Sequence, residues 1–285
     1  MTSSKGFIDK LHKANENNAS LICVGLDPDP ALMPIADIFE FNKAIIDATA
    51  DLVCAYKPNL AFYEAQGLKG LEALYRTRSY IPSSIPVIGD AKRGDIGNTA
   101  SAYARALFES LDFDAATLNP YLGRDAVDPF LAYESRCSFI LCRTSNKGAI
   151  DFQNLEVADK NPGPAATGDR MPLYEMVAKR AREWNTRGNV GLVVGATYPE
   201  ELKMIRLICP DMPILIPGIG AQGGDLEAAV RNGIDREGRN AIICSSRQVL
   251  YASRHEDFAM AARQVAINLR QEINSILASR NAGDH

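Results

Sequence analysis

The chain has 285 residues, of which 46% are hydrophobic and 23% are charged, and its net charge is −4. These values predict a globular protein with a substantial core, and the lack of a basic block argues against nucleic acid as a main partner. No apolar run approaches the roughly 18 residues of a membrane span, and the N-terminus lacks the apolar centre of a secretory signal. We therefore expect a cytoplasmic location and no membrane association.

Short apolar runs and helical segments alternate along the chain. A helix is expected over residues 5–17, before the first strand. Eight buried strands are predicted at residues 21–26, 54–59, 86–88, 115–118, 138–142, 190–194, 213–216 and 241–244. Helical segments follow them at residues 39–53, 62–80, 100–107, 126–133, 171–186, 200–208, 226–231 and 258–278.

Eight strand–helix units in about 250 residues predict an α/β fold of the (β/α)8 TIM-barrel type. A doubly wound open sheet is the alternative, and it is weaker because no G-x-G-x-x-G motif follows the first strand. No linker divides the chain, so residues 1–285 are expected to form one domain. The long irregular segment at residues 143–170 follows the fifth strand and is expected to be a lid, a binding loop or disordered.

The cysteines and histidines indicate no metal site. Several of the six cysteines lie inside apolar, strand-like runs and none forms a CxxC pair, which favours buried, reduced thiols. The three histidines are scattered along the chain and form no cluster. No cofactor motif is visible either, so we expect neither a bound metal ion nor a cofactor.

Charged side chains are concentrated in residues 87–100, which read VIGDAKRGDIGNTA. Asp90 and Lys92 share one face if the third strand extends to them, and Asp95 follows after a glycine. Taken alone, this string is typical of a solvated turn with surface ion pairs.

Two further charges change that interpretation. In a barrel the carboxyl ends of the strands meet at one cavity, and Asp27 and Lys57 stand at the ends of the first two strands. Alone, Asp27 could cap a helix and Lys57 could lie along the barrel rim. Alternating charges that face one cavity are costly to desolvate, so together they predict a catalytic site.

The ends of the last two strands predict a phosphate site. The sequence PGIGAQGGD at residues 217–225 leaves backbone N–H groups unobstructed before a helix N-terminus. Gln222 adds an amide donor, and Arg247 adds a guanidinium group that matches phosphate oxygens. Barrels commonly bind phosphate at these loops. A flexible turn beside a surface arginine is the alternative.

Seven strand-end segments together resemble one known family. They read VGLDPD, AYKPNLAFYE, GDAKRGDIGNTA, TLNPYLG, RTSN, PGIGAQGGD and SSR. The chain resembles orotidine 5′-phosphate decarboxylase, and more closely the longer bacterial subfamily of that enzyme. The resemblance extends from about Leu21 to the final helix and implies a metal-free, cofactor-free decarboxylation of orotidine 5′-monophosphate to UMP, the last step of de novo pyrimidine synthesis.

The resemblance also implies roles for individual residues. The catalytic tetrad would be Lys57, Asp90, Lys92 and Asp95, with Lys92 protonating C6 of the pyrimidine. Asp95 and Thr99 would act across the subunits of a homodimer. The remaining substrate contacts would be Asp27 at the ribose, Thr144 or Ser145 at the pyrimidine, and, around the phosphate, Gln222, Gly223, Ser246 and Arg247.

Three alternative functions remain open. Sugar-phosphate decarboxylases of the same superfamily share the D-x-K-x-x-D pattern but hold Mg²⁺ with an acidic residue at the second strand, where this chain has Lys57. A Schiff-base aldolase would need a lysine with a lowered pKa, which the neighbouring carboxylates oppose. A non-catalytic phosphate-binding barrel is the third alternative.

Overall fold

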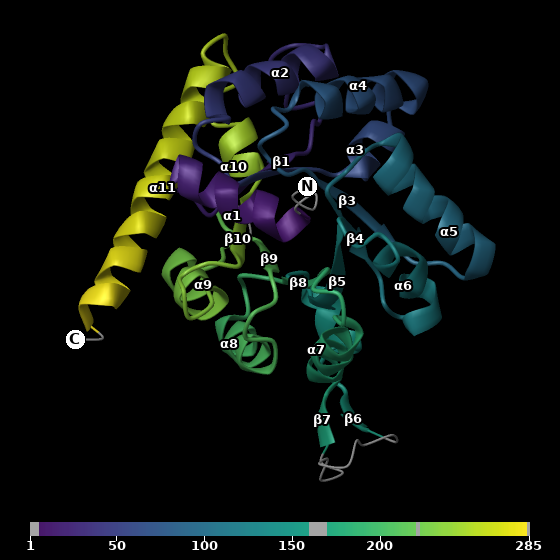
Figure 1. Cartoon of the computed structure of the whole chain (residues 1–285). Helices are drawn as coiled ribbons and strands as arrows, with labels where there is room; N and C mark the ends of the chain where they lie inside the picture. Colours follow the sequence, from purple (N-terminus) through teal and green to yellow (C-terminus); the bar gives the residue numbers. More distant parts are fainter. Residues whose placement is uncertain (1–5, 160–169, 221–222, 284–285) are drawn as a thin grey trace, which may run out of the picture.

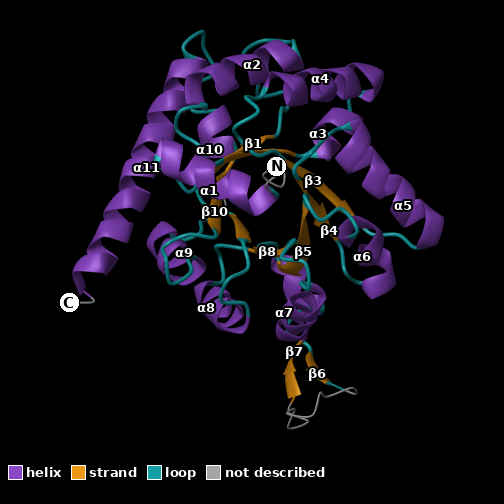
Figure 2. Ribbon diagram, in the orientation of Figure 1, coloured by secondary structure: helices purple, strands orange, loops and turns teal. Residues whose placement is uncertain are grey.

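The computed structural model describes residues 6–159, 170–220 and 223–283. Eight parallel strands form a barrel that helices surround (Figure 1, Figure 2). The strands are β1 (Ile22–Leu26), β2 (Ala55–Pro58), β3 (Ile88–Arg93), β4 (Ala115–Leu118), β5 (Cys137–Arg143), β8 (Val190–Val194), β9 (Ile214–Pro217) and β10 (Ala241–Ser245). They are ordered β2-β1-β10-β9-β8-β5-β4-β3, and parallel bridges from Tyr56 to Val87 and from Asn59 to Asp90 close the barrel. The predicted TIM-barrel fold is confirmed.

The helices cover the outside of the barrel. They are α1 (Phe7–Asn18), α2 (Ile38–Thr49), α3 (Leu60–Glu64), α4 (Gly67–Tyr80), α5 (Gly97–Arg105), α6 (Arg124–Leu131), α7 (Leu173–Trp184), α8 (Pro199–Ile208), α9 (Leu226–Gly233), α10 (Arg247–Leu250) and α11 (Phe258–Gly283). A π-helical turn, η1 (Ala106–Ser110), follows α5. Side-chain caps fix several helix starts; Asp37, for example, accepts a hydrogen bond from the N–H group of Glu40 (2.9 Å) at α2.

The inside of the barrel changes from apolar to polar along the strand direction. Side chains two residues apart on a strand share a face, so Ala55 and Lys57 both point inward on β2, as do Ala115 and Thr117 on β4. The first member of each pair belongs to a buried apolar cluster, and the second lines a cavity at the carboxyl end. The apolar layer thus fills the middle of the barrel and closes the cavity on the side opposite its opening.

The predicted N-terminal helix closes the opposite end of the barrel. Phe7 of α1 is 3% exposed and packs edge-on against Phe139 of β5, with 5.6 Å between ring centroids. Lys10 of the same helix forms an ion pair with Asp114 (2.8 Å). Helix α1 therefore covers the amino end of the barrel, opposite the cavity at the carboxyl ends of the strands.

Three elements differ from the sequence predictions. Strand β3 extends to Arg93, so Asp90 and Lys92 lie within the strand and not beyond it. The helical segment predicted over residues 62–80 divides into α3 and α4, because Gly67 has a positive φ of 60°. Helix α2 ends at Thr49, four residues before the predicted end at Val53.

The segment at residues 143–170 is not irregular throughout. It contains the 3₁₀ helix η2 (Lys147–Asp151) and the strand β6 (Glu156–Ala158), which pairs antiparallel with β7 (Arg170–Pro172). This hairpin projects away from the barrel below α7 in Figure 1. The sequence analysis missed it because both strands have only three residues, too few to show an alternating pattern.

Candidate active site

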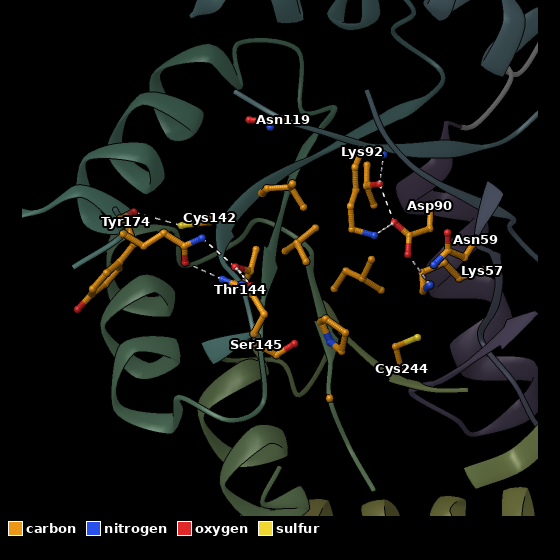
Figure 3. A pocket seen from close by; sticks show the side chains of 18 of the residues that line it. Lys57, Asn59, Asp90, Lys92, Asn119, Cys142, Thr144, Ser145, Tyr174 and Cys244 are labelled. Carbon is orange, nitrogen blue, oxygen red and sulfur yellow. Dashed lines mark hydrogen bonds and ion pairs between the residues drawn. The ribbon is translucent and has the colours of Figure 1, made fainter. Parts of the chain in front are cut away.

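A cavity of about 1040 Å³ lies at the carboxyl ends of the barrel strands. It is lined by eight of the residues predicted from the sequence, namely Asp27, Lys57, Asp90, Lys92, Thr144, Ser145, Ser246 and Arg247. These residues follow or end β1, β2, β3, β5 and β10, which are distant in sequence. The closed barrel thus brings most of the predicted site into one cavity (Figure 3).

Two lysines hold the carboxylate of Asp90 through different oxygen atoms. Lys57 Nζ lies 2.8 Å from Asp90 Oδ2, and Lys92 Nζ lies 2.6 Å from Asp90 Oδ1. Lys57 also approaches Asp27 Oδ1 at 4.0 Å. Lys57 is 4% exposed, whereas the Lys92 side chain is 51% exposed and reaches into the cavity (Figure 3). Lys92 is therefore the ammonium group that a bound ligand can contact.

Burial and charge act in opposite directions on this cluster. Desolvation alone would raise the pKa of Asp90, but Lys57 and Lys92 outweigh it and hold that pKa well below its usual range. Desolvation alone would lower the pKa of Lys57, but Asp90 and Asp27 raise it well above its usual value. Asp90 and Lys57 are therefore both charged at neutral pH, and each compensates the desolvation of the other.

The end of β5 is tied to the segment that follows it. The Thr144 N–H group donates to Gln153 Oε1 (2.9 Å), and Gln153 Nε2 donates back to Thr144 Oγ1 (2.8 Å). The buried Arg143 stacks on Tyr198, with the guanidinium carbon 3.5 Å from the ring centroid. These contacts hold Thr144 and Ser145 at the cavity wall, across the cavity from Lys57 (Figure 3).

The glycine-rich turn after β9 lies at another part of the rim. Gly218 lines the cavity beside Arg247. Gly220 has a φ of 77°, and a Cβ atom there would lie 2.2 Å from Gln248 Oε1, so this position requires glycine. Gly223 donates its N–H to the Gly220 carbonyl (2.9 Å) and does not line the cavity. Gln222 lies outside the described residues.

Asp95 and Thr99 do not line the cavity of their own chain. Asp95 is half-buried and accepts a hydrogen bond from the N–H group of Ile96 (2.8 Å), and Thr99 is exposed on α5. Ile96, which follows Asp95 in the sequence, is 57% exposed. Asp95 in the loop after β3 and Thr99 in the first turn of α5 therefore both lie outside the cavity of their own chain.

Several residues that the sequence analysis did not single out also line the cavity. Asn59 follows β2 and caps α3, accepting a hydrogen bond from the Ala61 N–H group (3.2 Å). Thr117 of β4 donates to Asp90 Oδ1 (3.0 Å). Thr117 could have been found from its sequence position, because it lies two residues after the inward-facing Ala115.

Among the described residues, no group of three or more His, Cys, Asp or Glu side chains could hold a metal ion. At the end of β2, where a metal-binding site would need an acidic ligand, Lys57 Nζ occupies the space beside Asp90 and Asp27. No helix in the described ranges is long and apolar enough to span a bilayer.

Comparison with known proteins gives a consistent family assignment. The model of the orotidine 5′-phosphate decarboxylase / HUMPS family matches residues 20–262. The chain is 53% identical over 269 residues to the orotidine 5′-phosphate decarboxylase of Dehalococcoides mccartyi, covering 94% of this chain and 97% of that protein. It is 51% identical over 280 residues to the protein of the same name from Cellvibrio japonicus, with 94% and 98% coverage.

Solved structures agree with this assignment. The OMP decarboxylase of Leishmania donovani is 42% identical with a TM-score of 0.82, and the match covers 95% of this chain and 98% of that one. The UMP synthase of the same organism is 43% identical with a TM-score of 0.84 over 96% of this chain, which spans only 57% of the synthase chain. The chain thus belongs to the orotidine 5′-phosphate decarboxylase / HUMPS family.

Proposed function

We propose that this chain decarboxylates orotidine 5′-monophosphate (OMP) to UMP and CO₂, the last step of de novo pyrimidine synthesis, without a metal ion or cofactor. One observation carries the proposal. Asp90 forms hydrogen bonds with Lys57 and Lys92 at the carboxyl end of a closed barrel. The Lys57 ammonium group is buried, whereas the Lys92 side chain is exposed to the cavity, where a ligand can contact it. The names of the relatives, orotidine 5′-phosphate decarboxylase, support the choice of substrate.

Lys92 supplies the central chemistry of this reaction. Loss of CO₂ breaks the bond from C6 to the carboxyl carbon and leaves the electron pair on C6, which has no adjacent carbonyl to accept it. The Lys92 ammonium beside C6 stabilises this developing charge and then transfers a proton to C6. Asp90, which lies 2.6 Å from Lys92 Nζ, orients the ammonium group for that transfer.

Asp90 also acts on the bound substrate. Its negative charge lies beside the substrate carboxylate and raises the free energy of the bound substrate relative to the transition state, in which the carboxylate departs as neutral CO₂. Lys57 keeps Asp90 in place through the 2.8 Å hydrogen bond to Oδ2. Binding energy from the distant phosphate group holds the substrate against this repulsion.

The remaining contacts are proposed from the family resemblance, and the lining of the cavity supports several of them. Asp27, close to Lys57, binds the ribose, and Thr144 or Ser145 at the opposite wall meets the pyrimidine. We assign the phosphate group to the part of the cavity lined by Gly218 and Arg247. We assign the other phosphate contacts to Gln222 and Ser246; Gly223, which the sequence also predicted, does not line the cavity and donates its N–H to Gly220.

We further propose that the enzyme is a homodimer in which Asp95 and Thr99 complete the site of the neighbouring subunit. Two facts support this assignment: neither residue lines its own cavity, and Asp95 is followed directly by the exposed apolar side chain of Ile96. Ile96 in the loop after β3 is 57% exposed, and Tyr121 and Leu122 in the loop after β4 are 80% and 49% exposed, which leaves them available for a contact between subunits. A cytoplasmic location agrees with the six buried cysteines, all of which are free thiols.

The test is the loss of OMP absorbance in the presence of purified protein, measured with and without EDTA. We expect full activity in EDTA. A strict requirement for Mg²⁺, or activity only on a sugar-phosphate acid, would instead favour the metal-dependent branch of the family. A covalent adduct trapped by borohydride would favour the Schiff-base aldolase, and binding of OMP without turnover would favour the non-catalytic barrel.

A further inference from the structure

Lys92 has a backbone conformation that its side chain alone would not select. Its φ is 47°, in the left-handed region that residues with a Cβ atom rarely adopt. Such a conformation persists only where the surroundings determine it. The proposed reaction depends on the Lys92 ammonium group, which is attached to a strained backbone. A neighbouring group must therefore stabilise this backbone conformation.

The strain coincides with an irregularity between β3 and β4. Gly89 pairs with Ala116 and Arg93 pairs with Leu118, so three residues of β3 lie opposite the single residue Thr117 of β4. In a regular parallel ladder, successive N–H groups of β3 would alternate between carbonyl acceptors on its two neighbours, β2 and β4. Here the bulge leaves N–H groups of β3 without a backbone carbonyl to bond.

The hydroxyl group of Thr117 binds those N–H groups. Thr117 Oγ1 accepts hydrogen bonds from the N–H groups of Ala91 (3.1 Å) and Lys92 (3.0 Å), and it donates to Asp90 Oδ1 (3.0 Å). A hydroxyl group has two acceptor positions and one donor proton. All three are used, and Thr117 is 1% exposed, so water does not compete.

This arrangement also fixes the direction of each bond. Because Oγ1 accepts from two N–H groups, its only proton points to Asp90, and that bond favours the charged carboxylate. The same Oδ1 atom accepts from Lys92 Nζ. One buried hydroxyl therefore determines both the backbone of Lys92 and the carboxylate that orients its ammonium group.

We propose that Thr117 is a positioning residue for Lys92: its hydroxyl group stabilises the left-handed backbone of Lys92 and the rotamer of Asp90, so that the ammonium points at the reacting carbon. This inference rests on the proposed decarboxylation, in which Lys92 is the proton donor. Thr117 acts only through Lys92 and Asp90 and takes no part in proton transfer.

The test compares Thr117→Val, which keeps the shape and removes the hydroxyl, with Thr117→Ser, which keeps the hydroxyl. For Thr117→Val we expect kcat to fall by about 100-fold, the size of effect that misplacing a catalytic group by about 1 Å produces. KM and the affinity for UMP should change little, because the ribose and phosphate contacts remain. Thr117→Ser should restore most of kcat.

A matched control separates positioning from general damage to the core. Thr49 is also a fully buried threonine, and its hydroxyl donates to the Ile45 carbonyl (2.7 Å) away from the cavity. Thr49→Val should lose stability without losing kcat. Equal loss of kcat in Thr49→Val and Thr117→Val would overturn the proposal, as would an unchanged kcat in Thr117→Val or a Thr117→Ser variant as inactive as Thr117→Val.

A second measurement tests the role of Thr117 without an activity assay. Amide hydrogen exchange over residues 88–93 should be faster in Thr117→Val than in the wild type, because the Ala91 and Lys92 N–H groups lose their acceptor. Unchanged exchange there would contradict the proposal even if the wild type showed no decarboxylation. Conversely, an active wild type with an unaffected Thr117→Val variant would leave the proposed function standing and remove only this inference.

Discussion

Asp90 is the residue on which the electrostatics of the site depend. It has 9% of its surface exposed and is bonded to two ammonium groups, so its ionised form is stabilised only in the folded protein. The sequence was sufficient to predict that Asp90 and Lys92 belong together. It could not show that Lys92 has a positive φ, because the cause is a hydroxyl group on a different strand.

The lowered pKa of Asp90 predicts a pH-dependent contribution to stability. A carboxyl group whose folded pKa is depressed contributes stability above its unfolded pKa of about 3.9 and loses that contribution as the pH falls further. The difference in the free energy of unfolding between wild type and Asp90→Asn should therefore be constant from about pH 5 to 7 and shrink below about pH 4.

Urea denaturation of both proteins, at pH values from about 7 to below about 4, measures this difference in the free energy of unfolding. Asp151→Asn serves as the control because Asp151 is exposed on η2; it should show little change at any pH. A difference for Asp90→Asn that grows on acidification would mean that Asp90 is not the stabilised carboxylate inferred from its contacts.

At the scale of elements, the barrel separates the parts that provide stability from the parts that provide chemistry. The amino-end loops bury charged groups for structural reasons. Arg206 of α8 is 9% exposed, and burial lowers its pKa to about 10. Its guanidinium group donates to five backbone carbonyls, those of Cys209, Pro210, Met212, Gly233 and Asn240.

Removing this guanidinium should affect stability and leave the chemistry intact. Arg206→Met leaves several buried carbonyls without a donor, so we expect the free energy of unfolding to fall by about 3 kcal/mol. Because these loops lie at the end of the barrel away from the cavity, kcat and KM of the folded variant should match the wild type.

Lys203→Met is the matched control, because Lys203 is exposed on the same helix. Its stability should change by no more than about 0.5 kcal/mol. Chemical denaturation and steady-state kinetics at low temperature measure both effects. A large loss of kcat in Arg206→Met would contradict the separation of the two ends.

The same separation explains which elements the sequence could predict. The eight strands were predictable because strands buried on both faces form short apolar runs, as the run Val190–Val194 does. The β6–β7 hairpin was not, since it lies outside the barrel and its residues carry no buried pattern. The division into α3 and α4 depended on the conformation of one glycine.

At the scale of the whole molecule, the proposed homodimer means that one chain alone does not hold a complete site. In this chain the carboxylate of Asp95 does not line the cavity, although the sequence analysis placed it in the tetrad. Sequence spacing cannot separate a residue that acts in its own subunit from one that acts in its neighbour. The structure adds that Ile96 and Tyr121 are exposed, which leaves both side chains available for a contact between subunits.

Heterodimers of two inactive variants test the shared site. Lys92→Ala and Asp95→Ala proteins are each expected to be inactive alone. In a heterodimer purified through two different tags, one of the two sites should combine an intact Lys92 with an intact Asp95, so about half of wild-type activity should return. If Asp95 acts in its own subunit, both sites remain defective and activity stays absent.

The central claim is that Lys92 donates the proton that turns OMP into UMP. The most direct measurement is the rate of OMP loss at saturating OMP, compared for wild type and Lys92→Ala, with UMP binding measured on the same samples. We predict rapid turnover by the wild type, no detectable turnover by Lys92→Ala, and UMP binding by both. Equal turnover of OMP by the two proteins, or none by either, would contradict the account.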